Sequence, residues 1–533
     1  MENVDARQIS SHIWAMANEL RGTMDAGEYK TFILSFMFYR YLSEHQEQYL
    51  ISDELVECEE GQSVNDAYKE LVNDQGLDAC LQDISSALGY AIEPQDTWAT
   101  LVANVHAGDV EPGDYQRLFD NFNKHAELNR EAVEDFFGVF DDINLGDSRL
   151  GSSTASRAKA LGEVVKLVDQ IEFHDESGRD ILGEVYEYLI GKFAASAGKK
   201  GGEFYTPHEV SLILAKIVTL GLKKGHDAFS IYDPAMGSGS LLMTVRDEVP
   251  DGERQGAVRF YGQELNTTTY NLARMNLMMR GVKYDNMNLH NADTLETDWP
   301  DGPDSQGIDR PRMFDAVVAN PPYSANWDNN ERKLKDPRFA DYGKLAPKSK
   351  ADYAFVLHSL YHLNQEGTMA IVLPHGVLFR SAAEAKIRQT LIEKNYLHAV
   401  IGLPANLFYG TGIPTIILVF KKNRTTRDTL FIDASNEFEK GKNQNTLSTE
   451  QINKIVTTYA NWADVDKYAH VATLKEIEEN EYNLNIPRYV DTFEEEEEID
   501  INEVNQLLAK DDEEIAALEK EISEQLALLG IKM

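Results

Sequence analysis

The chain has 533 residues, of which 42% are hydrophobic and 26% are charged, and its 89 acidic and 51 basic residues give a formal net charge of −38. This composition is typical of a folded globular chain and excludes a disordered or collagen-like one. The length predicts about three or four structural units. A chain this acidic can make few phosphate contacts, so a partner would have to supply most of the charge if the substrate were a nucleic acid.

The two cysteines, Cys58 and Cys80, are too few for a disulfide framework and favour a reducing cytoplasm. We expect no metal site at them. The first residues lack the basic and apolar segments of an export signal, and no run approaches the ~18 apolar residues that a membrane span requires. The sequence therefore predicts a cytoplasmic protein without a membrane-spanning segment.

Residues 1–155 predict a helical N-terminal domain. Phe32, Phe36 and Tyr39 have the i, i+4, i+7 spacing of one face of an amphipathic helix. We interpret this face as domain core rather than as an aromatic cofactor site.

A defined helix start follows the Gly- and Lys-rich run of residues 198–202. Thr206 is predicted as the N-cap and Pro207 as the first helical residue, where a missing N–H does no harm. Glu209 lies three residues after Thr206, so the pattern predicts a capping box.

Beyond this helix, strand patterns alternate with helical patterns up to about residue 475. Such alternation predicts an α/β domain with a mainly parallel sheet covered on both faces. Parallel sheets of this kind bind ligands beyond the carboxyl ends of their strands. The predicted strands are 229–234, 258–265, 314–322, 369–374, 398–404 and 415–420.

Residues 476–533 predict a C-terminal acidic segment, with a glutamate run at 494–498, and a final helix. The apolar residues of this helix recur at three-, four- and seven-residue steps, as in a coiled coil. They are Val504, Leu508, Ile515, Leu518, Ile522, Leu526 and Leu529. Two interpretations stay open, because this face could dock on another subunit or pack on its own chain.

The first chemical motif is the glycine loop of residues 233–242, DPAMGSGSLL, which ends one strand and opens a helix. Gly237 and Gly239 let a ligand approach the backbone, and the helix offers free N–H groups. Leu242 stands where a dinucleotide fingerprint has its third glycine, so the loop is not a standard dinucleotide site.

Two acidic residues follow later strands. Glu264 closes strand 258–265, where a carboxylate can accept hydrogen bonds from both hydroxyls of a ribose. Asp293 follows another short apolar run and could meet the adenine of the same nucleoside. The alternative for each residue is a solvated surface charge.

The most specific motif is the tetrad Asn320, Pro321, Pro322 and Tyr323, again after a strand. The prolines stiffen the segment, so the Asn320 amide oxygen and the Pro321 carbonyl oxygen are predicted to converge on one NH₂ group. Holding both N–H bonds favours a pyramidal nitrogen and stabilises developing positive charge without a strong base. Tyr323 offers a flat face for an aromatic ring. A structural proline turn is the alternative.

The local charge reverses sign after the tetrad. Phosphates could be met there close to the chemistry, although a solvated basic loop is the alternative. The basic residues are Arg332, Lys333, Lys335, Arg338, Lys344, Lys348 and Lys350.

Together these motifs resemble the adenine-N6 DNA methyltransferases. The chain as a whole is similar to the modification subunit of type I restriction-modification systems. This likeness rests on five segments in order, at residues 20–43, 202–207, 233–242, 266–281 and 406–420.

The resemblance implies a Rossmann-like methyltransferase domain at 156–475 that uses S-adenosyl-L-methionine. It implies methyl transfer to adenine N6 in duplex DNA, with the base flipped out of the helix. For the cofactor it implies contacts from Glu203, Phe204, Tyr205, Thr206, Pro207 and His208 at the methionine end, from Asp233, Gly237, Ser238, Gly239 and Ser240 at the amino acid part, from Glu264 at the ribose and from Asp293 at the adenine. For the target base it implies Asn320, Pro321, Pro322, Tyr323 and a second ring at Phe408.

The resemblance also implies partners: duplex DNA, a specificity subunit that binds two copies of this chain, and a motor-nuclease restriction subunit. The charge balance leads independently to a DNA-holding partner. Two other functions stay open. Similar tetrads occur in methyltransferases that act on protein glutamine or on RNA bases, and the chain could be a non-catalytic assembly subunit.

Overall fold

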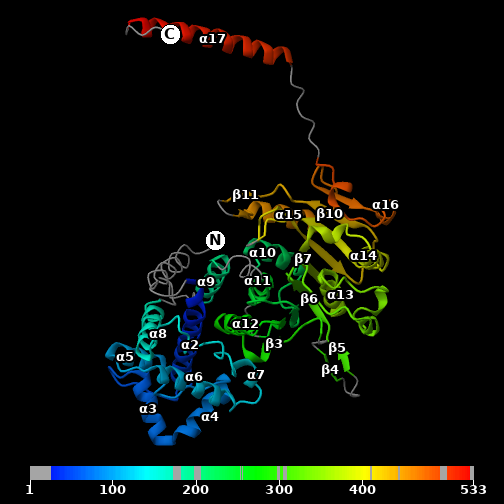
Figure 1. Cartoon of the computed structure of the whole chain (residues 1–533). Helices are drawn as coiled ribbons and strands as arrows, with labels where there is room; N and C mark the ends of the chain where they lie inside the picture. Colours follow the sequence, from blue (N-terminus) through cyan, green and yellow to red (C-terminus); the bar gives the residue numbers. More distant parts are fainter. Residues whose placement is uncertain are drawn as a thin grey trace. The chain divides into compact units, whose positions relative to one another are not determined.

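The structure is a computed structural model that describes residues 26–171, 182–196, 206–252, 254, 256–296, 301–303, 309–408, 411–441, 444–492 and 501–528. The chain divides into two compact units, one that ends at Val490 and one that begins at Asp491 (Figure 1). The domain boundaries predicted after residues 155 and 475 stay predictions.

The N-terminal part of the first unit is helical, as the sequence predicts. Helix α2 (Ala26–Ser52) buries Phe32, Phe36 and Tyr39 in the core. The Tyr41 hydroxyl of the same helix donates a hydrogen bond to the Met278 carbonyl at 3.0 Å, so α2 packs directly on the sheet region. The other helices of this part are α3 (Val64–Gln75), α4 (Leu77–Leu88), α5 (Trp98–Ala107), α6 (Pro112–Ala126), α7 (Val133–Phe136), α8 (Thr154–Asp169) and α9 (Leu182–Ser196).

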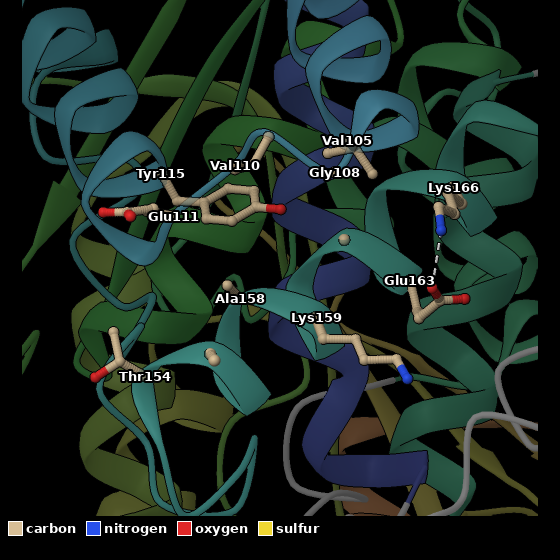
Figure 2. A pocket seen from close by; sticks show the side chains of 12 residues that line it. Val105, Gly108, Val110, Glu111, Tyr115, Thr154, Ala158, Lys159, Glu163 and Lys166 are labelled. Carbon is tan, nitrogen blue, oxygen red and sulfur yellow. Dashed lines mark hydrogen bonds and ion pairs between the residues drawn. The ribbon is translucent and has the colours of Figure 1, made fainter.

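A cavity of about 570 Å³ opens between α5, α6 and α8 (Figure 2). The fully buried Tyr115 lines it, and the Tyr115 hydroxyl has no hydrogen-bond partner among the described residues. An ion pair joins Lys166 to Glu163 at 2.9 Å beside it. Since its lining contains none of the residues predicted for chemistry, this cavity is separate from the candidate active site.

The described residues form a nine-stranded sheet in the order β13-β10-β8-β9-β7-β6-β1-β2-β3. Strands β7, β6, β1, β2 and β3 pair in parallel, β9 lies antiparallel between β7 and β8, and β13 is antiparallel to β10. The predicted mainly parallel sheet is confirmed. The strands are β1 (Phe229–Asp233), β2 (Val258–Glu264), β3 (Met287–Asn291), β6 (Phe314–Ala319), β7 (Leu363–Pro374), β8 (Leu397–Gly402), β9 (Thr415–Lys421), β10 (Thr429–Asp433) and β13 (Ala469–Ala472).

Helices cover both faces of this sheet because the strand residues of both faces are apolar. Adjacent residues Ile231 and Tyr232 of β1, for example, are both fully buried but belong to different core clusters. The helices of the sheet region are α10 (His208–Val218), α11 (Ser240–Glu248), α12 (Thr267–Met279), α13 (Asp352–Tyr361), α14 (Ala383–Glu393), α15 (Thr449–Asn461) and α16 (Leu474–Glu479). Two short ribbons pair β4 (Asp301–Pro303) with β5 (Asp309–Pro311) and β11 (Glu439–Lys440) with β12 (Asn445–Thr446).

The described part of the second unit is helix α17 (Ile501–Leu528), which confirms the predicted C-terminal helix. Its apolar side chains are open to solvent, with 54% of Ile515 and 52% of Leu518 exposed. Leu529 lies outside the described residues. Across the described ranges, no helix combines the length and the apolar character that crossing a membrane would need.

Candidate active site

Four of the predicted residues lie at the ends of neighbouring parallel strands. Asp233 ends β1, Glu264 ends β2, Asp293 follows β3 and Asn320 follows β6. Because β6, β1, β2 and β3 are adjacent in this order and run parallel, these residues share the carboxyl edge of the sheet.

The glycine loop connects β1 to α11 and turns through left-handed backbone conformations. Gly237 has φ 56° and Gly239 has φ 75°, values that side chains disfavour. A Cβ atom on Gly239 would lie 2.6 Å from Cδ1 of Leu277, so glycine also allows α12 to pack closely. The Asn276 amide donates to the Ser238 carbonyl at 2.9 Å, and Ser238 and Ser240 are both buried. The loop is therefore held against α12.

The buried carboxylate Asp233 and the half-buried carboxylate Glu264 flank this loop, and with Gly237 they form what we call the acidic corner. Glu264 accepts hydrogen bonds from the backbone N–H of Gly237 at 3.1 Å and of Asn266 at 2.8 Å. Asp233 is 1% exposed and accepts from the Ala235 N–H at 2.9 Å. Each carboxylate oxygen has lone pairs left for further donors.

Burial raises the pKa of both acids. The pKa of Asp233 rises to about 8 because of desolvation, to which the neighbouring Glu264 carboxylate adds. Desolvation also raises the pKa of Glu264, against the lowering effect of its backbone hydrogen bonds. Among the described residues neither acid has a cationic partner, so the acidic corner suits a ligand that brings a positive charge and hydroxyl donors.

Asp293 and Leu265 lie at the same edge of the sheet as the acidic corner, after β3 and β2. Asp293 follows β3, and one of its carboxylate oxygens accepts the Leu295 N–H at 2.9 Å. Leu265 directly follows Glu264 and is 68% exposed, so its side chain is accessible beside the strand-end acid. Sequence reasoning missed Leu265, although an apolar residue directly after the strand-end acid was the available signal.

The second group, which we call the amide corner, comprises Thr206, Asn320, Tyr323 and Phe408. The Asn320 amide nitrogen donates to the Thr206 hydroxyl oxygen at 3.1 Å. The Tyr323 hydroxyl donates to the Asn320 amide oxygen at 2.8 Å. The oxygen that the sequence assigns to an incoming NH₂ group therefore already accepts one hydrogen bond.

The rings of the amide corner meet edge to face. The centroids of Tyr323 and Phe408 are 6.0 Å apart with an interplanar angle of 73°. Phe408 is 4% exposed and Tyr323 is half-buried. Burial, together with the nearby Asp352 carboxylate, holds the pKa of the Tyr323 hydroxyl well above its ordinary value, so the hydroxyl stays a donor.

Asp352 and Arg380 support the turn after the tetrad, and sequence reasoning missed both. The Asp352 carboxylate, 1% exposed, accepts the Ser324 N–H at 2.8 Å and pairs with Arg380 at 2.7 Å. Ser324 has φ 52°, so this bond stabilises a strained residue directly after Tyr323. The only sequence signal was an acidic residue opening an otherwise apolar helix.

The predicted capping box at Thr206 is wrong. Helix α10 begins at His208, its N-cap is Pro207, and no side chain caps it. Pro207 has φ −52° and ψ 137°, so the chain turns into the helix one residue later than predicted. The Thr206 hydroxyl contacts Asn320 instead. Of the six residues expected at the methionine end of a cofactor, Glu203, Phe204 and Tyr205 lie outside the described residues.

The basic stretch after the tetrad is only partly available to phosphates. Lys333 and Arg338 are buried, which makes the expectation wrong for these two residues. The Lys333 ammonium donates to the Leu295 carbonyl at 2.9 Å, and Arg338 donates to the Thr294 carbonyl at 2.9 Å. They tie the stretch to the segment after Asp293. The exposed members are Arg332, which pairs with Asp328, together with Lys335, Lys344 and Lys348.

The described ranges contain no group of three or more His, Cys, Asp or Glu residues arranged to hold a metal ion.

Family comparisons cover nearly the whole chain. The family model described as "N-6 DNA Methylase" matches residues 177–498, and the one described as "HsdM N-terminal domain" matches residues 9–168. The type I restriction enzyme MpnII methylase subunit of Mycoplasma pneumoniae is 39% identical over 508 residues, which span 93% of this chain and 92% of that protein.

Solved structures agree with this match. The type I restriction-modification system methyltransferase subunit from Streptococcus thermophilus is 44% identical, with a TM-score of 0.83 over 92% of this chain and 100% of that one. A chain from a study of the assembly and conformational transition of the type I R-M system is 18% identical, with a TM-score of 0.62 over 98% of this chain and 99% of its own, and shows a shared fold.

Proposed function

The chain belongs to the N-6 DNA methylase family, among the methylase subunits of type I restriction enzymes, and from that premise we propose that it transfers a methyl group from S-adenosyl-L-methionine to N6 of adenine in duplex DNA. The observation that carries this proposal is the shared edge of the sheet, where the amide corner follows β6, the strand next to β1 and its glycine loop. A base held at the amide corner would lie beside a cofactor held at the glycine loop.

The acidic corner and its neighbours are proposed to bind the cofactor. When bound, S-adenosyl-L-methionine supplies an electrophilic methyl carbon on a positively charged sulfur. Asp233 and residues 237–240 would hold its amino acid part, and the raised pKa of Asp233 fits a buried acid that needs an ammonium partner. Glu264 would accept from the ribose hydroxyls. Asp293 and the exposed Leu265 would border the adenine.

The methionine end of the cofactor is assigned to residues 203–208. His208 is exposed and Pro207 is buried at the start of α10. This segment precedes α10, which packs on β7 and on β6, the strand that the tetrad follows.

The amide corner is proposed to hold the flipped adenine. The Asn320 amide oxygen and the Pro321 carbonyl oxygen would each accept one N6–H, which makes the nitrogen lone pair available and stabilises its developing positive charge. Tyr323 and Phe408 would hold the two faces or edges of the purine, while Pro322 keeps the turn stiff. Positioning supplies most of the acceleration, and no strong base is required.

The partners follow from charge and from α17. With a net charge of −38 and several buried basic residues, this chain can make few phosphate contacts, so we propose that a partner holds most of the duplex. We propose that the exposed apolar face of α17 docks on a specificity subunit that binds two copies of this chain, and that a motor-nuclease subunit joins for restriction. The two free cysteines, Cys58 and Cys80, fit a cytoplasmic complex.

A product assay tests the function. The chain is purified with its specificity subunit and incubated with methyl-labelled S-adenosyl-L-methionine and duplex DNA, and the DNA is digested to nucleosides. Labelled N6-methyladenine supports the proposal. Label in protein glutamine or in RNA would favour the other methyltransferase functions. Calorimetry that shows no cofactor binding would favour a non-catalytic assembly subunit.

A pair of variants on α17 tests the docking surface. Ile515→Lys places a charge in the apolar face, whereas Glu513→Lys changes the charge of the same turn on the polar side. We expect Ile515→Lys to weaken co-purification with the specificity subunit at least about 10-fold. Glu513→Lys should leave it intact, and equal loss in both variants would contradict an apolar interface.

A further inference from the structure

The Asn320 amide is held at both ends by hydroxyl groups from different parts of the chain. Its nitrogen donates to Thr206 at 3.1 Å, and its oxygen accepts from Tyr323 at 2.8 Å. Thr206 lies 114 residues away and Tyr323 only three. The long-range contact to Thr206 therefore ties the amide to a distant part of the chain.

Amide orientation decides whether Asn320 can serve an amino group. The two ends of the amide have nearly the same shape, but one accepts hydrogen bonds and the other donates them. If the amide turned over, its N–H groups would face the N–H groups of adenine N6, and the acceptor would be lost. The hydrogen bond to Thr206 must break before the amide can rotate, so it restrains the amide in the arrangement that leaves its oxygen for an amino group. Because a hydroxyl both donates and accepts, this bond anchors the amide rather than selecting its orientation.

The Thr206 hydroxyl is available for this contact because it does not cap helix α10. Helix α10 is capped at Pro207 without any side-chain bond, so the Thr206 hydroxyl is not engaged with the first turn. Pro207 fixes the backbone after it, and α10 packs on β6 and β7. The hydroxyl is therefore presented to Asn320 from a stiff support.

The Tyr323 hydroxyl occupies the opposite end of the amide. Its ring contacts Phe408, and the next residue, Ser324, is tied to Asp352. An entering amino group must share the Asn320 oxygen with this hydroxyl or displace it. One neutral hydrogen bond of this kind corresponds to a competition of about 5-fold.

We propose that Thr206 is a positioning residue that fixes the Asn320 amide for catalysis, and that the Tyr323 hydroxyl is a placeholder on the Asn320 oxygen that the amino group of the flipped base displaces. This inference rests on the proposed function and deepens it. It separates two roles: the Thr206 hydroxyl serves the methyl-transfer step, and the Tyr323 hydroxyl opposes entry of the base while its ring supports the base.

The test uses the complex of the full chain with its specificity subunit. Thr206→Val keeps the side-chain shape without the hydroxyl, and Thr206→Ser keeps the hydroxyl. Thr219→Val is the matched control, because Thr219 lies at the other end of α10 and bonds only the Ala215 carbonyl in its own turn. Thermal unfolding verifies that all variants fold.

For Thr206→Val we expect kcat, measured at saturating S-adenosyl-L-methionine, to fall about 10-fold. This change should exceed any change in the dissociation constant for S-adenosylhomocysteine, measured by calorimetry, because Thr206 also belongs to the segment assigned to the cofactor. Thr206→Ser should restore kcat to within about 2-fold, and Thr219→Val should not change it. A weakened dissociation constant at unchanged kcat would overturn the positioning role and assign Thr206 to the cofactor.

For Tyr323→Phe we expect the opposite pattern. Its KM for duplex DNA should fall about 3-fold to 5-fold at similar kcat, because the competing hydroxyl is gone. Duplexes with 2-aminopurine at the target position should show brighter emission, which reports a larger flipped fraction. Unchanged KM and unchanged emission would overturn the placeholder role.

The proposed function and the positioning role of Thr206 can be contradicted by separate results. If the unaltered complex forms no labelled N6-methyladenine, the proposed function fails and the positioning role falls with it. If the unaltered complex is active and Thr206→Val matches its kcat, only the positioning role fails.

Discussion

The acidic corner and the amide corner share one edge of the sheet but are held in different ways. In the acidic corner, backbone N–H groups of Gly237, Ala235 and Asn266 bind carboxylates that lie at most 27 residues away. In the amide corner, side chains bind side chains across more than 100 residues. The acidic corner is therefore formed by two strand-helix units that are consecutive in the chain. The amide corner forms only when the whole domain has folded.

This difference has a functional consequence. Backbone donors keep their places as long as the strands and α11 are intact, so the acidic corner is preorganised and each of its side chains can be altered alone. The amide corner depends on rotamers of Thr206, Asn320 and Tyr323, which constrain each other. We therefore expect substitutions in the acidic corner to change cofactor affinity, and substitutions in the amide corner to change rate or base entry.

The largest effect is expected for Asn320→Ala. Loss of the amide removes an acceptor that acts on the developing charge, and groups of this kind contribute about 1,000-fold to kcat. Methyl transfer to duplex DNA should fall by at least that factor, while calorimetry with S-adenosylhomocysteine gives an unchanged dissociation constant. Loss of cofactor affinity in this variant would merge the two corners and contradict the comparison.

The next effect is expected for Glu264→Ala, measured by the same calorimetry. The variant loses two charge-assisted acceptors for the ribose and the partner of the Gly237 N–H, which predicts about 100-fold weaker binding. Glu264→Gln keeps one acceptor and serves as the matched variant, with a loss of about 10-fold. At saturating cofactor both variants should retain kcat within about 3-fold, and a large loss of kcat would place Glu264 in the chemistry.

The same contrast explains how much the sequence predicts. The strands, the glycine loop and the acids at their ends are local patterns, so β1, β2, β6 and the shared edge could be predicted. The Thr206 cap could not, because local pattern favours a cap while tertiary structure recruits the hydroxyl for Asn320.

The burial of Lys333 and Arg338 could not be predicted either. Their charge predicts exposure, but in the folded chain both side chains donate hydrogen bonds to buried carbonyl groups. Strand β10 and the edge strand β13 were missed because their pairing is decided by the rest of the sheet. Leu265, Asp352 and Arg380 also required the fold, because the sequence shows neither that Leu265 is exposed nor that Asp352 pairs with Arg380.

The pH dependence of cofactor binding tests whether Asp233 of the acidic corner binds the ligand's ammonium group. Burial raises the pKa of Asp233 to about 8, so most of this acid is protonated at pH 6. An ammonium group binds the ionised form, hence affinity should rise about 10-fold per unit from pH 6 toward 8. Above pH 8 the free ligand's own amino group loses its proton, and affinity should fall again. Calorimetry with S-adenosylhomocysteine from pH 6 to 9 measures this curve.

Asp233→Asn is the control for that curve. It cannot ionise, so the rising limb between pH 6 and 8 should disappear while the falling limb remains. The stability of the free protein provides a second measurement. Because the folded form holds the Asp233 proton up to about pH 8 and the unfolded form loses it near pH 4, this acid lowers stability as pH rises between these values. The decline should be shallower in Asp233→Asn.

The smallest effect is expected for Phe408→Leu, and it tests whether the amide corner ends at the tetrad or includes a ring from the segment after β8. Leucine keeps the buried apolar volume but loses the edge contact with Tyr323, which is worth about 1 kcal/mol, and loses the second aromatic surface for the base. KM for duplex DNA should rise about 5-fold with kcat nearly unchanged. Leu407→Met alters the neighbouring buried residue without touching a ring and should leave KM as it is. If both variants raise KM equally, Phe408 contributes packing alone, and the amide corner holds the base with one ring rather than two.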